Sequence, residues 1–271
     1  MCHKILCISR SEVFSPQSVE RDFSMISATS QALRQVGFAV EVRKETELQD
    51  FSGFDAILSM GRALETLRLL SQAQKAGIPV LNHPSSVALC GARYQLLSTL
   101  HEVVPIPHFG LVQGTATPPF PYWLKADGYT TTAFPVQKCP AHSPIVASLV
   151  PRCLYMQHVE GTLVKFYGVL HTDFFEACVV SSDISQKTTV GKSATSEIPF
   201  ESLSNTVQTS LKNLAEQAAK RVMLDIYGGD AVIDEQGCLW LIDFNDWPSF
   251  SFCQNQAAKA IVQRVSQVLG K

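Results

Sequence analysis

Asp243 stands inside an otherwise apolar run near the C-terminus, and this carboxylate constrains the fold strongly. The surrounding segment, Tyr227 to Phe250, reads YGGDAVIDEQGCLWLIDFNDWPSF. Two apolar-rich runs, 230–234 and 238–244, are separated by the turn signal Glu235-Gln236-Gly237, a pattern that predicts a β-hairpin. An unpaired carboxylate inside such a strand is energetically expensive, so we expect Asp243 to have a charged or metal partner.

Side chains alternate between the two faces of a strand, so Leu241, Asp243 and Asn245 are predicted to share one face. With the turn centred on residues 235–236, Asp230 would pair opposite Leu241 and lie diagonal to Asp243. A register shift of one residue would move Asp230 to the other face. Three oxygen-bearing side chains on one face suit Mg²⁺ that bridges nucleotide phosphates. The alternative is an edge hairpin that carries ordinary surface carboxylates.

The composition narrows the range of functions. The chain has 271 residues, of which 46% are apolar, enough for one large domain or for two or three small lobes. The formal net charge of −2 and the lack of a basic run argue against binding to nucleic acid. No apolar run approaches the roughly 18 residues of a transmembrane helix, so we expect no membrane partner. Eight cysteines without a C-x-x-C pair indicate reduced thiols in a cytoplasmic protein.

Predicted strands and helices alternate over residues 1–83. The predicted strands cover residues 4–9, 38–42, 55–60 and 78–81. The alternation favours a parallel α/β lobe, and ligands of such sheets collect at the carboxyl ends of the strands. Those ends carry Arg10, Ser11 and Arg62, and the two arginines suggest an anionic small-molecule acceptor.

Two further lobes are expected, at residues 84–155 and 156–271. A helix is predicted from Ser85 to about His101, and a strand-rich pattern follows it as far as residue 170. A long amphipathic helix from about 200 to 224 precedes the hairpin, and a last helix closes the chain. The fold class is therefore α/β, with one parallel lobe and two α+β lobes.

Three basic side chains between the first lobe and the hairpin are candidates for phosphate contacts. Lys125 ends the apolar strand PYWLK, where a compact positive charge can face a phosphate. Lys165 lies inside the apolar run LVKFYG. A single lysine in either place is more commonly a solvated surface residue. Arg93, on the predicted helix, can reach a phosphate or remain on a solvated helix face.

The order of these segments resembles the ATP-grasp superfamily over nearly the whole chain. A small α/β lobe ending in IPVLNHP is followed by a helix, by a β-rich lobe with YWLK, and by the hinge MQHVEG. The strand LVKFYGV, a long helix, and the pair GGDAVID and LIDFNDWPSF complete the order. The same segments also resemble the inositol-polyphosphate kinase branch and uncharacterised bacterial ATP-grasp proteins with an FNDWPSF ending.

The resemblance implies an ATP-grasp fold that uses ATP and Mg²⁺, with Mn²⁺ as an alternative, and it implies roles for the matching residues. The residues that match the metal ligands are Asp230, Asp243 and Asn245. Those that match the nucleotide-phosphate lysines are Lys125 and Lys165. Gln157, His158 and Val159 match the adenine-contacting hinge, and Glu160 lies where the ribose is often contacted. Many proteins of this family are dimers, so a homodimer is also expected.

Two departures from the family pattern bear on the reaction. The flap after Lys125 reads DGYTTT, with one glycine where the family commonly has a glycine-rich segment, so threonine hydroxyls would have to act as donors. The arginine that the family's ligases often place near the metal hairpin is missing between residues 221 and 264. The candidates for its role are Lys165, Arg93, Arg10 and Arg62.

Three functions remain open from the sequence. The first is a ligase that activates a carboxylate as an acyl phosphate, which an amine or another nucleophile then attacks. The second is a small-molecule kinase with a hydroxyl acceptor. The third is a nucleotide-binding module without turnover, which the glycine-poor flap and the missing arginine favour. The sequence does not identify the acceptor.

Overall fold

The N-terminal part of the chain folds as a parallel α/β lobe. The computed structural model describes residues 2–15, 18–128, 136–149, 152–181, 196–199 and 203–271. Four strands form the first sheet in the order β2-β1-β3-β4, and each neighbouring pair runs parallel. They are β1 (Lys4–Ser9), β2 (Ala39–Lys44), β3 (Ala56–Ser59) and β4 (Val80–Leu81). The parallel sheet confirms the predicted α/β lobe.

Helices and short 3₁₀ turns connect these strands. The longer helices are α1 (Val19–Gln35) and α2 (Leu64–Lys75), and the turns are η1 (Glu12–Phe14) and η2 (Glu45–Glu47). Glu45 is buried, and its carboxylate accepts hydrogen bonds from the backbone N–H groups of Ser11, Arg62 and Ala63. One buried carboxylate therefore ties together the loops that follow β1 and β3.

The single helix predicted from Ser85 is wrong, because the structure has two helices there. α3 (Pro84–Gly91) begins one residue earlier, and His83 caps it by accepting a hydrogen bond from the Ser85 N–H at 3.3 Å. The chain leaves the helical conformation at Ala92, and α4 (Arg93–Leu100) follows. Arg93 therefore occupies the first turn of a new helix rather than the middle of a long one.

A small antiparallel sheet forms the next part of the molecule, with the strand order β5-β10-β7-β8. Its strands are β5 (Phe109–Leu111), β7 (Tyr122–Ala126), β8 (Gln137–Cys139) and β10 (Cys153–Gln157). A two-stranded ribbon of β6 (Thr115–Ala116) and β9 (Ile145–Val146) and a 3₁₀ turn, η3 (Ala147–Leu149), complete it. Tyr122, Leu124 and Ala126 are buried along β7, so the alternating pattern turns Lys125 to the other face.

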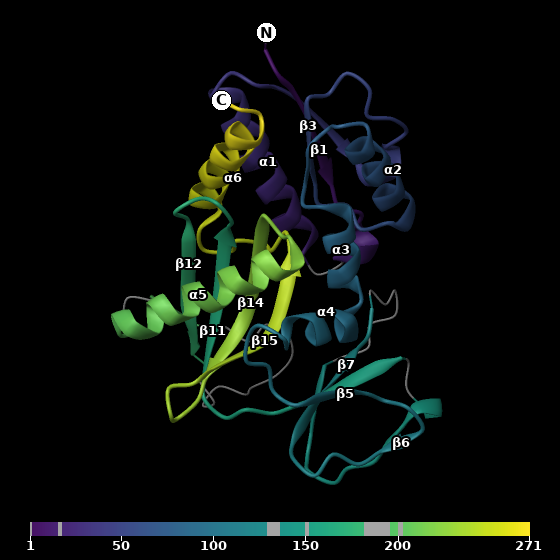
Figure 1. Cartoon of the computed structure of the whole chain (residues 1–271), viewed down its shortest axis with the longest axis vertical. Coiled ribbons are helices and arrows are strands. Elements are labelled where there is room, and N and C mark those ends of the chain that lie inside the picture. Colours follow the sequence, from purple (N-terminus) through teal and green to yellow (C-terminus); the bar gives the residue numbers. More distant parts are fainter. Residues whose placement is uncertain (1, 16–17, 129–135, 150–151, 182–195, 200–202) are drawn as a thin grey trace.

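A five-stranded antiparallel sheet in the order β13-β12-β11-β14-β15 occupies the middle of the molecule (Figure 1). Its strands are β11 (Thr162–Val169), β12 (Phe175–Ser181), β13 (Ser196–Pro199), β14 (Ile226–Ile233) and β15 (Leu239–Asp246). Helix α5 (Asn205–Val222) covers one face of this sheet and shares its core with α4. The predicted α/β class is thus confirmed, with the hairpin of β14 and β15 at one edge of the sheet.

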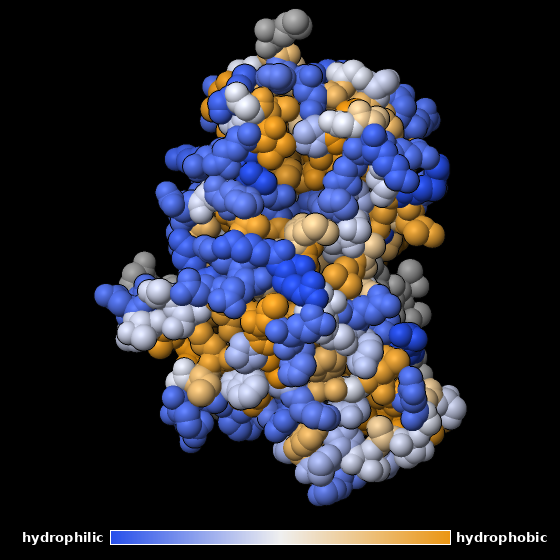
Figure 2. Space-filling model, in the orientation of Figure 1, coloured by the Kyte–Doolittle hydropathy of each residue, from blue (hydrophilic) through white to orange (hydrophobic). Residues whose placement is uncertain are grey.

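The last helix, α6 (Gln254–Val268), returns to the first lobe and lies beside α1 (Figure 1). Met25, Ile26 and Leu33 of α1 form one core with Ala257 and Ile261 of α6. Figure 2 shows hydrophilic residues over most of one face, with small apolar patches between them. Of the helices in the described part of the chain, none combines the length and the apolar character needed to cross a membrane.

Candidate active site

A bulge in the C-terminal hairpin brings Asp230 and Asp243 directly opposite each other. From the turn inward the register is regular as far as the pair Ala231 and Leu241, and the next pair is Asp230 and Asp243. Ile242 is the extra residue on β15, which is the arrangement of a β-bulge. The predicted pairing of Asp230 with Leu241 is therefore wrong.

The bulge also changes which residues share a face. Leu241 is fully buried and belongs to the same hydrophobic core as Phe244, three residues later. Asp243 and Asn245 instead line a cavity on the opposite side, where the Asn245 Nδ2 donates a hydrogen bond to the Asp243 Oδ2 at 2.8 Å. The predicted common face of Leu241, Asp243 and Asn245 is thus wrong for Leu241, because the bulge interrupts the alternation.

Three cationic side chains surround this pair of carboxylates. Lys165 of β11 lies opposite Asp230 of β14 in the register of these neighbouring strands. The Nζ of Lys125 donates a hydrogen bond to the backbone carbonyl of Ile242, the bulge residue, at 2.9 Å. The Nε of Arg93 lies 3.9 Å from the Asp243 Oδ1. The structure therefore gathers the predicted phosphate-contacting and metal-ligating residues around one point.

The charges at this point shift each other's pKa values. Burial and the neighbouring Asp243 raise the pKa of the Asp230 carboxyl to about 6. Burial also acts on Asp243, but the charges of Arg93 and Lys125 outweigh it and hold the pKa of that carboxyl below its usual value. Burial lowers the pKa of the Lys125 ammonium, while the charge of Asp243 opposes that shift. Two facing carboxylates, one of them with a raised pKa, form a site that an added cation would stabilise.

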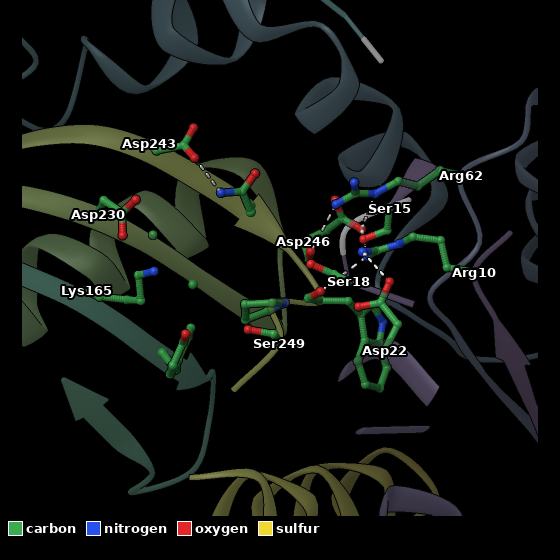
Figure 3. A pocket seen from close by; sticks show the side chains of 16 residues that line it. Arg10, Ser15, Ser18, Asp22, Arg62, Lys165, Asp230, Asp243, Asp246 and Ser249 are labelled. Atoms are coloured by element: carbon green, nitrogen blue, oxygen red, sulfur yellow. Dashed lines mark hydrogen bonds and ion pairs between the residues drawn. The ribbon is translucent and has the colours of Figure 1, made fainter. Parts of the chain in front are cut away.

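A cavity of about 300 Å³ extends from the carboxylate pair to the first lobe (Figure 3). Its hydroxyl-bearing lining residues are Ser15, Ser18, Tyr167 and Ser249. In Figure 3, Asp230 and Asp243 project from neighbouring strands at one end, and Arg10 and Arg62 reach in from the other. The backbone of Gly228 and Gly229 forms part of the wall between the two ends.

The two arginines predicted to contact an acceptor line this cavity as members of ion pairs. The NH1 of Arg10 lies 3.2 Å from Asp22 Oδ2, and the NH2 of Arg62 lies 2.7 Å from Asp246 Oδ1. Ser11 does not line this cavity but a neighbouring one of about 390 Å³. The acceptor end of the cavity therefore contains two arginines balanced by two aspartates.

Solved structures resemble this chain over its whole length. D-alanyl-alanine synthetase A from Vibrio cholerae superposes with a TM-score of 0.73 at 13% identity, covering 100% of this chain and 99% of that chain. The ATP complex of D-alanine–D-alanine ligase from Bacillus anthracis gives 0.71 at 10% identity, with 100% and 99% covered. The ATP-grasp ligase PsnB with its minimal precursor gives 0.66 at 14% identity, with 97% and 100% covered.

The chain has the ATP-grasp fold. This confirms the fold expected from the order of the sequence motifs. No protein-family model matches the sequence, and a search of curated proteins finds no match. Because the identities are so low, the structural likeness establishes the fold alone, and the reaction depends on this chain's own side chains.

In this ATP-grasp fold the hinge residues lie apart from the carboxylate pair. Gln157, His158, Val159 and Glu160 line a separate cavity of about 450 Å³. Two hydrogen bonds hold the His158 ring, one of 2.9 Å from Trp123 Nε1 to its Nδ1 and one of 2.7 Å between its Nε2 and Glu160 Oε1. The hinge and the metal-ligand candidates thus line two different cavities. The flap residues 129–132 lie outside the described residues.

The residues of this ATP-grasp site fit a divalent cation with an incomplete set of protein ligands. Asp230 and Asp243 supply two carboxylates, and Asn245 keeps its Oδ1 for a further contact because its Nδ2 binds Asp243. Within the described ranges, no group of three or more His, Cys, Asp or Glu side chains could hold a metal ion. Any ion at the pair would therefore need further oxygen ligands from phosphate and water, as Mg²⁺ commonly has.

Sequence reasoning missed three residues of this site. Asp246 and Asp22 neutralise the arginines, and the carbonyl of Ile242 holds Lys125. An acid directly after Asn245 was a visible signal for Asp246, but an acid in the first turns of a helix, such as Asp22, is common in any protein. A bulge carbonyl has no signal in the sequence at all.

Proposed function

We propose that this protein is a Mg²⁺- and ATP-dependent ligase that joins a carboxylate, through an acyl phosphate, to an amine or another nucleophile. The observation that carries the proposal is the convergence of Lys125, Lys165 and Arg93 on the pair Asp230 and Asp243. Facing carboxylates with cations around them suit a metal–triphosphate complex, in which charges of both signs must be held at close range. The similar solved structures that are named as ligases support the same class of reaction.

Each residue has a proposed role in that reaction. Asp230, Asp243 and the Oδ1 of Asn245 would hold Mg²⁺ or Mn²⁺, which would neutralise part of the negative charge of the phosphates. Lys125 and Lys165 would contact the phosphates of ATP. Arg93 would stabilise charge on the transferred phosphoryl group, together with Lys165, because no arginine lies on the hairpin itself.

The nucleoside of ATP would occupy the hinge cavity. Gln157, His158 and Val159 would contact the adenine, and Glu160 the ribose. His158 is held from both sides by Trp123 and Glu160, which supports a preformed surface for a flat base. The Glu160 carboxylate is exposed and also lies 3.4 Å from the Lys138 Nζ, so binding of a ribose there would compete with that weak ion pair.

The acceptor would bind in the cavity of about 300 Å³ between the carboxylate pair and the first lobe. Its carboxylate oxygen would attack the γ-phosphorus as the bond to the bridging oxygen breaks and ADP leaves. A nucleophile would then attack the acyl carbon, lose a proton, and displace inorganic phosphate. An anionic acceptor that meets Arg10 and Arg62 would have to share them with Asp22 and Asp246, and Ser11 would contact only a substrate that extends into the neighbouring cavity.

The decisive experiment is product analysis after incubation with Mg-ATP and a pool of carboxylate and amine metabolites. A ligase releases ADP and inorganic phosphate in equal amounts and forms a conjugate that mass spectrometry detects. A kinase forms ADP and a phosphorylated acceptor without free phosphate. Binding of Mg-ATP without any ADP would indicate a nucleotide-binding module. Asp243→Ala is the control, and ADP formation by that variant would contradict the metal assignment.

A small-molecule kinase is the second candidate, favoured by one specific observation. No residue of the hairpin 226–246 is an arginine, and Gly228, which lies next to the carboxylate pair, has no side chain that could replace one. A kinase transfers the phosphoryl group directly and forms no tetrahedral carbon intermediate that would need such an arginine. The same product analysis separates the two reactions.

The wider organisation is proposed on the same basis. Lobes at 1–83, 84–155 and 156–271, with ATP between the last two, suit the three larger sheets formed by the described strands. None of the eight cysteines, all of which the structure describes, forms a disulfide, which suits a cytoplasmic protein. A homodimer is a further proposal, and light scattering of the purified protein would test it.

A further inference from the structure

Three side chains of the first lobe hold the open end of the hairpin that carries the carboxylate pair. Arg10 follows β1 directly, Arg62 lies shortly after β3, and Asn82 follows β4 directly. The Asn82 Nδ2 donates to the Ile226 carbonyl at 2.7 Å, and its Oδ1 accepts from the Ile226 N–H, also at 2.7 Å. Residues at the carboxyl ends of three parallel strands thus bind the beginning of β14 and the end of β15 through hydrogen bonds and ion pairs.

The contact with β15 is made through Asp246, the last residue of that strand. Its carboxylate is fully buried and lies 2.7 Å from the Arg62 NH2 and 3.7 Å from the Arg10 NH2. The same two guanidinium groups also donate to the backbone, Arg62 to the Asp246 carbonyl at 3.3 Å and Arg10 to the Trp247 carbonyl at 3.2 Å. Figure 3 shows Asp246 between the arginines and the carboxylate pair.

Asn245 lies at the end of β15, directly before the residue that the two arginines hold. β15 is the edge strand of its sheet, so among the described strands it pairs only with β14. Asn245 lies opposite Gly228, which offers no side chain to hold it, and one residue before Asp246. An edge strand frays at its end unless another group holds the backbone, and Asp246 anchors the residue directly after Asn245.

Further contacts fix the two arginines that bind Asp246. The buried Glu45 carboxylate accepts hydrogen bonds from the Arg62 N–H at 2.8 Å and from the Ser11 N–H, next to Arg10. The Arg10 NH1 is held by Asp22 of α1 at 3.2 Å. Both guanidinium groups therefore reach Asp246 from rigid loops, so Asp246 has little freedom to move.

We propose that Asp246 is a positioning residue that fixes Asn245 for metal binding, by locking the end of β15 to Arg62 and Arg10 of the first lobe. The inference rests on the metal assignment made above. Asp246 itself need not touch the ion. Its carboxylate points to the arginines, and its effect is transmitted through the backbone to Asn245. Supporting groups of this kind typically change metal affinity by about 10- to 100-fold when they are removed.

The test measures Mn²⁺ binding rather than turnover. Electron paramagnetic resonance titration of Mn²⁺, with a non-hydrolysable ATP analogue present, is compared between wild type and Asp246→Asn. We expect Mn²⁺ affinity to fall about 10- to 100-fold, while the affinity for the analogue without metal stays unchanged. A purely structural role would lower the melting temperature and leave the Mn²⁺ affinity of the folded protein as it was, and that result would overturn the proposal.

Asp225→Asn is the matched control. Asp225 directly precedes β14, and its Oδ1 forms a similar ion pair with the Arg264 Nε at 2.6 Å. It pairs the hairpin with α6 instead of the first lobe, so we expect Mn²⁺ affinity like that of wild type. If Asp246→Asn does not fold, Arg62→Lys carries the test, because it keeps the charge and loses the two-pronged contact. Wild-type Mn²⁺ affinity in Arg62→Lys would then overturn the proposal, whereas no Mn²⁺ binding by the wild type would overturn the metal assignment itself.

Discussion

Asp230 and Asp243 face each other across β14 and β15, although the register near the turn would have placed them on opposite faces. Continued without change, that register would pair Asp230 with Ile242. The bulge takes up Ile242, so Asp243 moves to the position opposite Asp230. It also leaves the Ile242 carbonyl to accept the hydrogen bond from Lys125. One extra residue therefore creates both the carboxylate pair and the contact for the lysine.

Asp230→Asn should stabilise the metal-free protein while it abolishes Mg-ATP turnover. The half-buried Asp230 carboxyl, with its pKa raised to about 6 by burial and by Asp243, opposes folding at neutral pH. A neutral isostere removes that opposition, and the gain in unfolding free energy should be about 1 to 3 kcal/mol. Urea unfolding at pH 7 in the presence of a chelator measures it. A less stable variant would contradict this prediction and would show that neighbouring cations already offset the cost of burying the Asp230 charge.

The thiols should divide by burial when they are labelled at pH 8. Burial raises the pKa of the Cys7 thiol to about 11, so Cys7 stays protonated and enclosed within the first sheet. Cys2 and Cys238 are exposed. We expect an alkylating reagent to modify Cys2 and Cys238 within minutes and Cys7 only after denaturation, as read by peptide mass spectrometry. Labelling of Cys7 in the native protein would contradict the packing of β1.

Residue types predicted the hairpin, but its register depended on contacts that residue types do not reveal. Asp234 closes the turn by accepting hydrogen bonds from the N–H groups of Gln236 and Cys238, at 3.0 and 2.8 Å. This turn is centred on Gln236, half a residue beyond the predicted centre, since Ile233 pairs with Leu239. Local hydrophobic alternation cannot distinguish such small shifts, and it cannot signal a bulge.

The first lobe was predictable because three strands with buried residues, a flanking strand and the helices between them leave a strong periodic pattern. The role of its strand ends was not predictable, because it depends on partners far away in the chain. Arg62 and Asp246 are separated by 184 residues, and only the folded chain brings them together. The rule that ligands gather at such ends led to Arg10 and Arg62 as acceptor contacts, whereas the structure pairs both with aspartates.

Gly229→Ala should disrupt the carboxylate pair by separating the strands that carry it. A Cβ added at Gly229 would collide with the backbone carbonyl of Asp243 and would lie 2.7 Å from the Phe166 Cζ. Backbone cannot move aside as a flexible side chain can, so β14 and β15 would have to shift. We expect a loss of about 1 to 3 kcal/mol in unfolding free energy and weaker Mn²⁺ binding. Unchanged values for both would show that the bulge absorbs the extra methyl group.

Lys125→Met should weaken nucleotide binding without unfolding the protein. Lys125 is held by the bulge carbonyl at 2.9 Å, and its charge lies within reach of both aspartates. Methionine keeps the length and the apolar stem, so only the ammonium is lost. A charge-assisted hydrogen bond to phosphate contributes about 1.5 to 3 kcal/mol, so the dissociation constant of Mg-ATP should rise about 10- to 100-fold in calorimetry.

Lys75→Met, at the exposed end of α2, is the matched control and should bind Mg-ATP like wild type. Equal affinities for both variants would remove Lys125 from the phosphate site and leave it as a lysine that only closes the bulge.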